Sequence, residues 1–393
     1  MSFFDIPAGY RFTGMASGIK KSGKLDLALI YSNQPARVAG VFTRNKVVAA
    51  PLQLTQPRVT AGFCQAVLVN SGNANACTGE AGLQIARETS AILARELSIA
   101  EDLVAVASTG VIGVQMPIAP FAQGIPKLVK TLAADQVTVV AEAIMTTDAF
   151  TKVASAKGDG YSVLGLAKGA GMIHPNMATM LGFVMTDAKV APELLDSALR
   201  RAVKNSFNSI TVDGDTSTND LVLLLANGAA GGEEIQPGSE VAECFCQYLD
   251  RVLLDLAKMI VRDGEGASKL VEIRVTGAAS EEEARTVAKS VATSSLVKTA
   301  FFGEDANWGR IIAAVGYSGI EVDQNKIDIR FNQILVVRNG LSTGPELEAE
   351  ATDVLKLDEF VVSIELNQGE AVSSYYTSDL GYEYIKINAD YRT

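Results

Sequence analysis

A threonine that could act as a nucleophile lies near the middle of this 393-residue chain, at Thr179. A threonine hydroxyl reacts poorly unless a base lies beside it, and a free α-amino group on the same residue can be that base. Such an amine titrates at about 7.7–8.0, so it can accept a proton near neutral pH. Creating it requires cleavage between Ala178 and Thr179, which the hydroxyl could perform by attacking the preceding carbonyl. Without cleavage, the pair would begin a buried strand over residues 179–185.

A second candidate pair, Thr109 and Gly110, stands in a run of small residues. Such a pair in a tight turn can direct a hydroxyl and backbone N–H groups at one oxygen, as an oxyanion hole requires, but it also suits a plain turn. The single histidine, His174, rules out a metal site with several histidine ligands, and a Ser-His-Asp triad would have to use it. A structural role in its loop and a contribution to self-cleavage both fit His174.

The secondary-structure elements that must position these residues indicate an α/β fold. Periodicity predicts strands at 25–31, 38–43, 66–70, 270–276, 326–337, 359–366 and 382–388, and helices at 85–97, 191–205, 241–262 and after a cap at Ser280. Residues 18–24 imitate a phosphate-binding loop, but Leu25 stands where Ser or Thr should hold magnesium. Residues 213–224 begin like a calcium loop, but they lack its glycine and its final glutamate. We therefore expect no metal and no cofactor.

Composition restricts the class of protein further. The formal net charge of −11 argues against nucleic-acid binding, which needs a basic patch. No apolar run reaches the ~18–20 residues of a membrane span, and the first residues lack the pattern of a signal peptide. Four cysteines in a chain of this length do not indicate a disulfide framework. We expect a cytoplasmic protein that acts on small molecules.

Several motifs together resemble the ornithine acetyltransferase family of arginine biosynthesis. They are Gly-Ala-Gly-Met-Ile-His-Pro-Asn-Met-Ala-Thr-Met-Leu at 169–181 and the segments 107–113, 144–148, 213–220, 263–266 and 303–310. The likeness extends from Tyr10 to the last residue. It implies layered sheets covered by helices, and self-cleavage into an α chain, 1–178, and a β chain, 179–393. The two chains would remain one folded unit and assemble as two α and two β chains.

The resemblance also implies roles for individual residues. Thr179 would carry the acetyl group, and Thr109 with Gly110 would form the oxyanion hole. Substrate contacts would come from Thr146, Lys168, Glu265, Asn388 and Thr393, and segment 213–220 would be structural support close to the site. From the residues alone, Lys168 could be a solvated loop lysine, Glu265 an exposed loop acid, Thr393 a frayed end, and Thr147 and Asp148 turn caps.

The activity that the resemblance implies is acetyl transfer from N2-acetyl-ornithine to glutamate through an acetyl-threonine intermediate. Three alternatives stay open. The enzyme could also use acetyl-CoA as donor, which would make it bifunctional. It could be a related self-processing aminopeptidase, in which water reaches the acyl-enzyme. It could also be a ligand-binding protein without catalysis.

Overall fold

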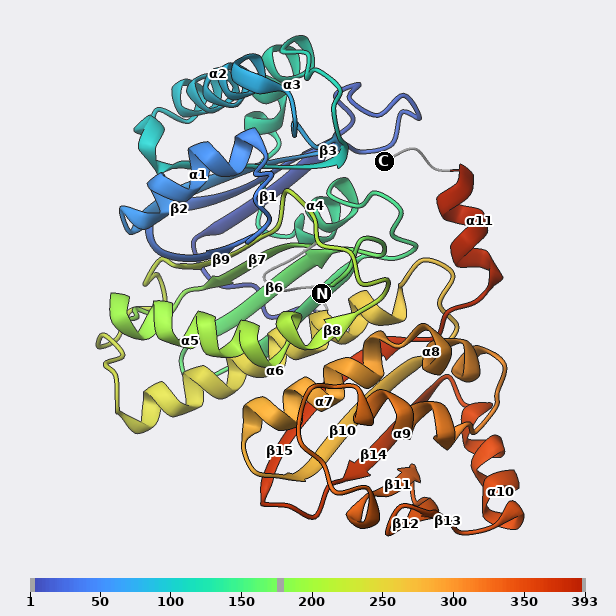
Figure 1. Ribbon diagram of the computed structural model, residues 1–393. Coiled ribbons are helices and arrows are strands. Elements are labelled where there is room, and N and C mark those ends of the chain that lie inside the picture. The colour runs from blue at the N-terminus through green and yellow to red at the C-terminus, as the bar shows by residue number, and fades with distance from the viewer. Residues whose placement is uncertain (1–3, 175–179, 391–393) are drawn as a thin grey trace.

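The computed structural model describes residues 4–174 and 180–390, and in that part of the chain helices are layered over two β-sheets (Figure 1). The first sheet runs in the order β4-β3-β2-β9-β7-β6-β5, and β1 pairs with the first part of β2. Its strands are β1 (Tyr10–Met15), β2 (Leu27–Phe42), β3 (Phe63–Asn73), β4 (Val104–Val111), β5 (Lys152–Lys157), β6 (Ser162–Lys168), β7 (Leu181–Thr186) and β9 (Leu221–Ala226). The predicted α/β fold of layered sheets covered by helices is confirmed.

Two strands that the sequence predicted separately, 25–31 and 38–43, form one long strand, β2. Its first part pairs with β1 and β3, and its last part pairs with β9. The pairing with β3 shifts register between Tyr31 and Ala36. Pro35 lies inside this irregular stretch, where its missing N–H costs no regular ladder hydrogen bond. The polar residues there interrupt the apolar pattern, but they do not end the extended backbone.

Alternating side chains divide the apolar residues of the first sheet between two cores. In β9, Leu221, Leu223 and Leu225 belong to an inner core that β1–β4 share with β6, β7 and the helix α4 (Val137–Ala143). Val222 and Leu224 belong to the core on the other side. This period-2 alternation is what a strand buried on both faces produces, and it fixes the register of β9 between β2 and β7.

Helices cover the outer sides of these layers. α2 (Gly79–Leu97) and α3 (Ala119–Lys130) pack over β2–β4, and α1 (Ala50–Thr60) packs against β4. α5 (Pro192–Asn205) and α6 (Glu240–Arg262) cover the opposite side, and the apolar faces that the sequence predicted for both are buried. No helix in the described part of the chain has the length and apolar character needed to cross a bilayer.

The second sheet lies beyond α6 (Figure 1) and runs in the order β13-β12-β11-β14-β10-β15-β8. Its strands are β8 (Ile210–Thr211), β10 (Leu270–Ala278), β11 (Asp328–Phe331), β12 (Ile334–Arg338), β13 (Leu341–Ser342), β14 (Glu359–Glu365) and β15 (Ala371–Ser378). One face packs under α7 (Glu281–Thr293), α8 (Ser295–Phe302), α9 (Trp308–Gly316) and α10 (Pro345–Leu355). The predicted cap of α7 is present, because Ser280 Oγ accepts a hydrogen bond from Glu283 N.

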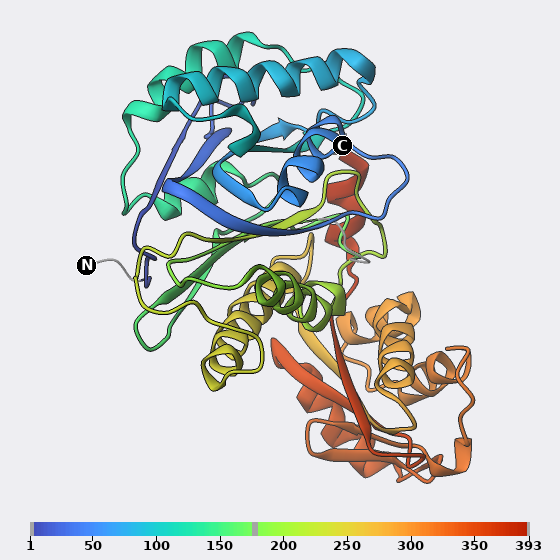
Figure 2. The same cartoon turned by 90° about the vertical axis from the view of Figure 1, so that its left-hand side faces the viewer.

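The last described element corrects the sequence prediction. Residues 382–388 were expected to form a strand, but they belong to the helix α11 (Tyr382–Asp390). Alternating aromatic and β-branched residues suggested period 2, whereas the half-buried residues, Tyr384 and Ile387, follow helical spacing. Figure 2 shows α11 rising from the second sheet toward the layers of the first. Gly266 permits this approach, since a Cβ there would lie 2.4 Å from Tyr384 N.

Candidate active site

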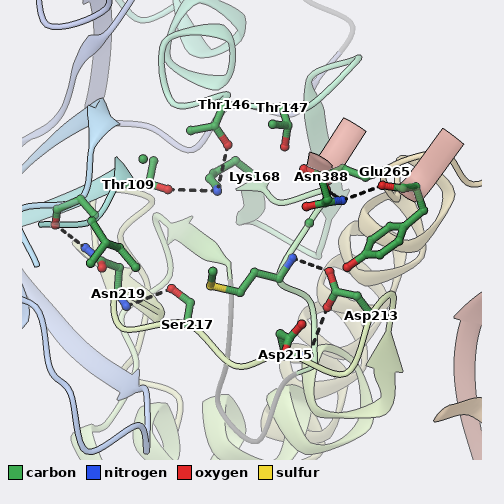
Figure 3. A pocket seen from close by; sticks show the side chains of 16 residues that line it. Thr109, Thr146, Thr147, Lys168, Asp213, Asp215, Ser217, Asn219, Glu265 and Asn388 are labelled. Carbon is green, nitrogen blue, oxygen red and sulfur yellow. Dashed lines mark hydrogen bonds between the residues drawn. The ribbon is translucent and has the colours of Figure 1, made fainter. Parts of the chain in front are cut away.

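A cavity of about 240 Å³ lies near the carboxyl ends of β4 and β6 (Figure 3). Six residues that the sequence analysis singled out line it together: Thr109, Gly110, Thr146, Lys168, Glu265 and Asn388. They come from β4, β6, α11 and the loops before β5 and after α6, so only the folded chain brings them together. This volume suits a ligand the size of an amino acid. The predicted Ala178, Thr179 and Thr393 lie outside the described residues.

Lys168 places a buried ammonium among these groups. The residue is 6% exposed, and its Nζ donates hydrogen bonds to Thr109 Oγ1 at 3.1 Å and to Thr146 Oγ1 at 3.3 Å. Burial lowers the pKa of Lys168, and the charge of Asp148 opposes that effect. Lys168 is therefore not the solvated loop lysine that its sequence context allowed. Its two described partners are neutral hydroxyls, so its charge remains available to a ligand carboxylate.

The ladder between β3 and β4 holds the Thr109–Gly110 pair. Gly110 lies opposite Gly72 with a φ of 130°, and a Cβ at Gly110 would lie 2.4 Å from the carbonyl carbon of Gly72. Only glycine fits both the conformation and the space. Because Thr109 Oγ1 accepts from Lys168, the hydroxyl hydrogen of Thr109 is left to bind another acceptor. The pair thus has the donor that the predicted oxyanion hole requires.

Asp148 caps the turn that carries Thr146, because its Oδ2 accepts a hydrogen bond from Thr146 N at 2.9 Å. The turn-cap interpretation of Asp148 is therefore confirmed. Its Oδ1 also accepts from Gly169 N at 2.7 Å and from Lys152 Nζ at 2.8 Å. Thr147 lines the cavity beside Thr146. Of the two, Thr146 is the one whose hydroxyl has a hydrogen bond to Lys168.

Glu265 and Asn388 form the opposite wall of the cavity (Figure 3). Asn388 Nδ2 donates to Glu265 Oε2 at 2.9 Å, and Glu265 N donates to Ala170 O at 2.9 Å. A Cβ at Gly171 would lie 2.4 Å from the carboxyl group of Glu265, so glycine there lets the carboxylate approach the strand end. Glu265 is half-buried in the wall of a cavity and is not an exposed loop acid.

The polar segment 213–220 holds the chain before the predicted cleavage point. Asp213 accepts hydrogen bonds from Met172 N at 2.6 Å and from Ile173 N at 2.8 Å. Val212 N in turn donates to Ile173 O at 2.7 Å. Burial raises the pKa of Asp213, although these N–H groups favour its charged form. The prediction that this segment is structural support close to the site is confirmed.

The same segment leads into β9, the strand that holds the chain after the predicted cleavage point. Leu221 N donates to Met180 O at 3.2 Å, and β7 begins at Leu181. Leu181 pairs with Lys168 of β6 on one side and with Leu221 of β9 on the other. In the sequence, Leu181 follows the predicted nucleophile by two residues.

His174 is the last described residue before the predicted cleavage point. Its Nδ1 lies 3.2 Å from Thr211 Oγ1, and its carbonyl accepts a hydrogen bond from Thr216 Oγ1 at 3.0 Å. Burial and the nearby charge of Lys289 lower the pKa of His174 to about 4, and Asp215 only partly opposes them. The ring is therefore neutral near neutral pH. These contacts give His174 the local structural role that the sequence allowed.

Several polar residues for which the sequence predicted no individual contact also line the cavity, namely Asp213, Asp215, Ser217, Asn219 and Tyr384. Asn219 Nδ2 donates to Ala74 O at 2.7 Å and to Ser108 O at 2.9 Å, so it ties the polar segment to β4. The unusual density of polar residues in 213–220 could have indicated that Asn219 lies at the site. Tyr384 was hidden by the incorrect strand prediction.

The described residues contain no cluster of three or more histidine, cysteine, aspartate or glutamate side chains arranged to hold a metal ion. Asp213, which opens the calcium-like segment, binds backbone N–H groups. All four cysteines are free thiols, with Cys64 and Cys246 buried and Cys77 and Cys244 exposed. The described polar side chains that line the cavity carry hydroxyl, ammonium, carboxylate and amide groups.

Known proteins are similar to this chain along nearly its whole length. A model of the ArgJ family matches residues 11–393. The arginine biosynthesis bifunctional protein ArgJ of Syntrophotalea carbinolica is 62% identical over 388 residues, which cover 98% of this chain and 99% of that protein. The protein of the same name from Geobacter sulfurreducens is 54% identical over 389 residues, with the same coverage. A solved structure of the arginine biosynthesis bifunctional protein argJ from Bacillus halodurans is 48% identical with a TM-score of 0.53, and the match covers 54% of this chain and 100% of that one.

Proposed function

This chain belongs to the ArgJ family, and we propose from that membership that it transfers an acetyl group from N2-acetyl-ornithine to glutamate through the hydroxyl of Thr179. Its relatives are named for arginine biosynthesis. The observation that carries the proposal is the gathering of Thr109, Lys168 and Glu265, from distant parts of the sequence, around one amino-acid-sized cavity.

In the first half of the reaction, the α-amine of Thr179 takes the proton from its own hydroxyl, which attacks the acetyl carbonyl. Negative charge develops on the carbonyl oxygen. Thr109 can stabilise it, because the hydroxyl that accepts from Lys168 has its own hydrogen left to donate. Ornithine then leaves with the proton held by the amine. Glutamate enters, and its amine attacks the acetyl-threonine ester in the reverse sense.

The charged walls suit amino-acid substrates. The Lys168 ammonium would pair with the α-carboxylate, which lies close to the reacting nitrogen in both N2-acetyl-ornithine and glutamate. Glu265, on the opposite wall, would pair with the side-chain ammonium of ornithine. Thr146 would orient the same carboxylate through the hydroxyl that already binds Lys168, and Asn388 would hold Glu265 in place.

Cleavage between Ala178 and Thr179 would create the nucleophile. Hydrogen bonds anchor the backbone at Ile173 and at Met180, which are described residues on either side of this bond. The whole Bacillus halodurans chain matches 54% of this chain, close to the share that residues 179–393 occupy. The products 1–178 and 179–393 would stay together, since β7 pairs with β6.

The mature protein would contain two α and two β chains and work in the cytoplasm on small molecules alone. Its four free thiols suit a reducing compartment. Thr393 would contribute a further substrate contact. The position of α11, which carries Asn388 into the cavity wall, supports that assignment because Thr393 follows Asn388 by five residues.

One observation favours the bifunctional alternative, in which acetyl-CoA is a second donor. A larger cavity of about 930 Å³ adjoins the first and shares Thr146 with it. Lys20, Lys21 and Lys24 line it, and positive side chains suit a phosphate-bearing donor. The relatives are also named bifunctional.

One experiment separates these functions. The purified protein is incubated with acetyl-labelled N2-acetyl-ornithine, with and without glutamate, and again with labelled acetyl-CoA. We expect the peptide that begins at Thr179 to gain the label, and glutamate to remove it as N-acetyl-glutamate. Release of free acetate in place of transfer would indicate a hydrolase of the aminopeptidase type. An uncut chain that still transfers acetyl groups would overturn the mechanism.

A further inference from the structure

A buried ion triad lies directly behind the candidate site. Lys152 Nζ lies 2.8 Å from Asp148 Oδ1 and 2.5 Å from Asp263 Oδ2, and these three side chains are at most 3% exposed. Moving such charges out of water costs free energy that an apolar cluster of the same volume would not require. The triad therefore contributes little to stability by its mere presence, and its contacts indicate another role.

Asp148 joins the triad to two residues of the cavity. Its Oδ2 accepts from Thr146 N, and its Oδ1 accepts from Gly169 N, the amide that follows Lys168. One carboxylate thus fixes the backbone on both sides of the hydrogen bond between Lys168 and Thr146. A shift of this carboxylate would move the ammonium and the hydroxyl relative to each other.

Asp263 offers a matched comparison. It binds the same Lys152, and it accepts a hydrogen bond from Ala149 N at 3.0 Å. In the described part of the chain it accepts none from Thr146 or from the amide after Lys168. The two aspartates therefore share the ion pair and differ in their attachment to the site.

Charge distinguishes Asp148 as well. The ionisable groups that face Lys168 are Asp148, Asp220, Glu265, Lys152 and Lys20. Burial raises the pKa of Asp220 well above its usual range. Burial also acts to raise the pKa of Asp148, but Lys152 and Lys168 outweigh it and lower that pKa to about 2. Asp148 is therefore a buried carboxylate that stays ionised beside Lys168 near neutral pH.

We propose that Asp148 is a positioning residue for acetyl transfer, which holds Lys168 in place as an ammonium and sets it against Thr146. Lys152 and Asp263 keep the Asp148 carboxylate ionised and fixed. This role rests on the proposed function, since it presumes that Lys168 binds the substrate carboxylate. Asp148 would act through Lys168 by keeping that side chain charged, without contacting the substrate or the nucleophile itself.

The test compares Asp148→Asn with Asp263→Asn. KM and kcat for N2-acetyl-ornithine are measured across neutral and alkaline pH, together with the thermal midpoint of each variant. Loss of a facing carboxylate makes the lysine easier to deprotonate. The alkaline rise in KM should therefore begin about one pH unit lower in Asp148→Asn than in the unmodified enzyme. At neutral pH its KM should rise about tenfold, because two backbone contacts are weakened.

Asp263→Asn is the control for stability. It should lower the thermal midpoint to a similar extent, because it too disrupts the pair with Lys152. The alkaline pH at which its KM begins to rise should stay near that of the unmodified enzyme. Equal pH profiles for the two variants would overturn the proposal and leave the triad a purely structural role. An unmodified enzyme without acetyl transfer would instead overturn the proposed function.

A second substitution decides the matter if Asp148→Asn does not fold. Asp148→Glu keeps the charge but moves the carboxylate. Its KM should therefore begin to rise at the same alkaline pH as in the unmodified enzyme, but its KM at neutral pH should be higher. An unchanged KM in this variant would contradict positioning by Asp148. Lys168→Arg supplies the remaining check, because arginine stays protonated and should remove the alkaline rise altogether.

Discussion

Replacement of Thr109 by alanine tests the proposed oxyanion hole. The residue is 8% exposed, and its hydroxyl has one described partner, Lys168 Nζ at 3.1 Å. Loss of one oxyanion donor costs about 2.7–4 kcal/mol in the transition state, so kcat should fall roughly 10²- to 10³-fold. The effect on folding should be smaller, about 1 kcal/mol, because Lys168 keeps its contact with Thr146. KM should change little, since the donor acts mainly in the transition state.

Thr146→Ala is the matched control, because it also removes one hydroxyl from Lys168. The assay is the steady-state rate of N-acetyl-glutamate formation, with self-cleavage confirmed by intact mass for each variant. We expect Thr109→Ala to lose kcat, Thr146→Ala to raise KM, and Thr109→Ser to retain most activity. Similar effects of the two alanine variants on KM, with kcat intact in both, would refute the reasoning and make Thr109 a substrate-binding residue.

Three further outcomes follow from the proposed mechanism. Thr179→Ala should leave one folded, inactive chain, while Thr179→Ser should still cleave; intact-mass analysis that finds the alanine variant cut would contradict this. Deletion of Tyr391 to Thr393, or a carboxyl-terminal tag, should raise KM for both substrates without preventing cleavage, and unchanged KM values would remove Thr393 from the pocket. Because His174 has its pKa lowered to about 4 by burial and by Lys289, the cleavage rate of fresh precursor should show no inflection near 6.5; an inflection there would assign the ring a proton-transfer role.

Amphipathic segments were the most predictable part of this fold. The buried faces of α5 and α6 and the alternation of β10 follow from side-chain periodicity alone. Periodicity failed at Pro35, where the chain stays extended through a polar stretch, and at α11. A short helix owes its stability mainly to tertiary contacts, and Asn388 and Tyr384 make theirs with residues more than a hundred positions earlier.

The site was predictable only where a local motif marked it. The Thr109–Gly110 pair, which lies in β4, and the Glu265 loop carry a signature in the sequence. The enclosure of Lys168 does not, since it depends on strands that pair across the sheet. Asp148 was interpreted as a turn cap because its cap is local, whereas its contacts with Lys152 and Gly169 are visible only in the folded chain.

The pairing of β6 with β7, on either side of the proposed cleavage point, bears on how the mature enzyme could refold. In the precursor, a short connection between Lys168 and Leu181 keeps the entropy of closing this antiparallel pair small. After cleavage the same pair would join separate molecules, so recovery from denaturation would become a second-order process that slows on dilution. The uncut Thr179→Ala chain should refold at a rate independent of its concentration. The precursor would thus fold in a unimolecular process, whereas the separated chains would have to associate before they could regain the native state.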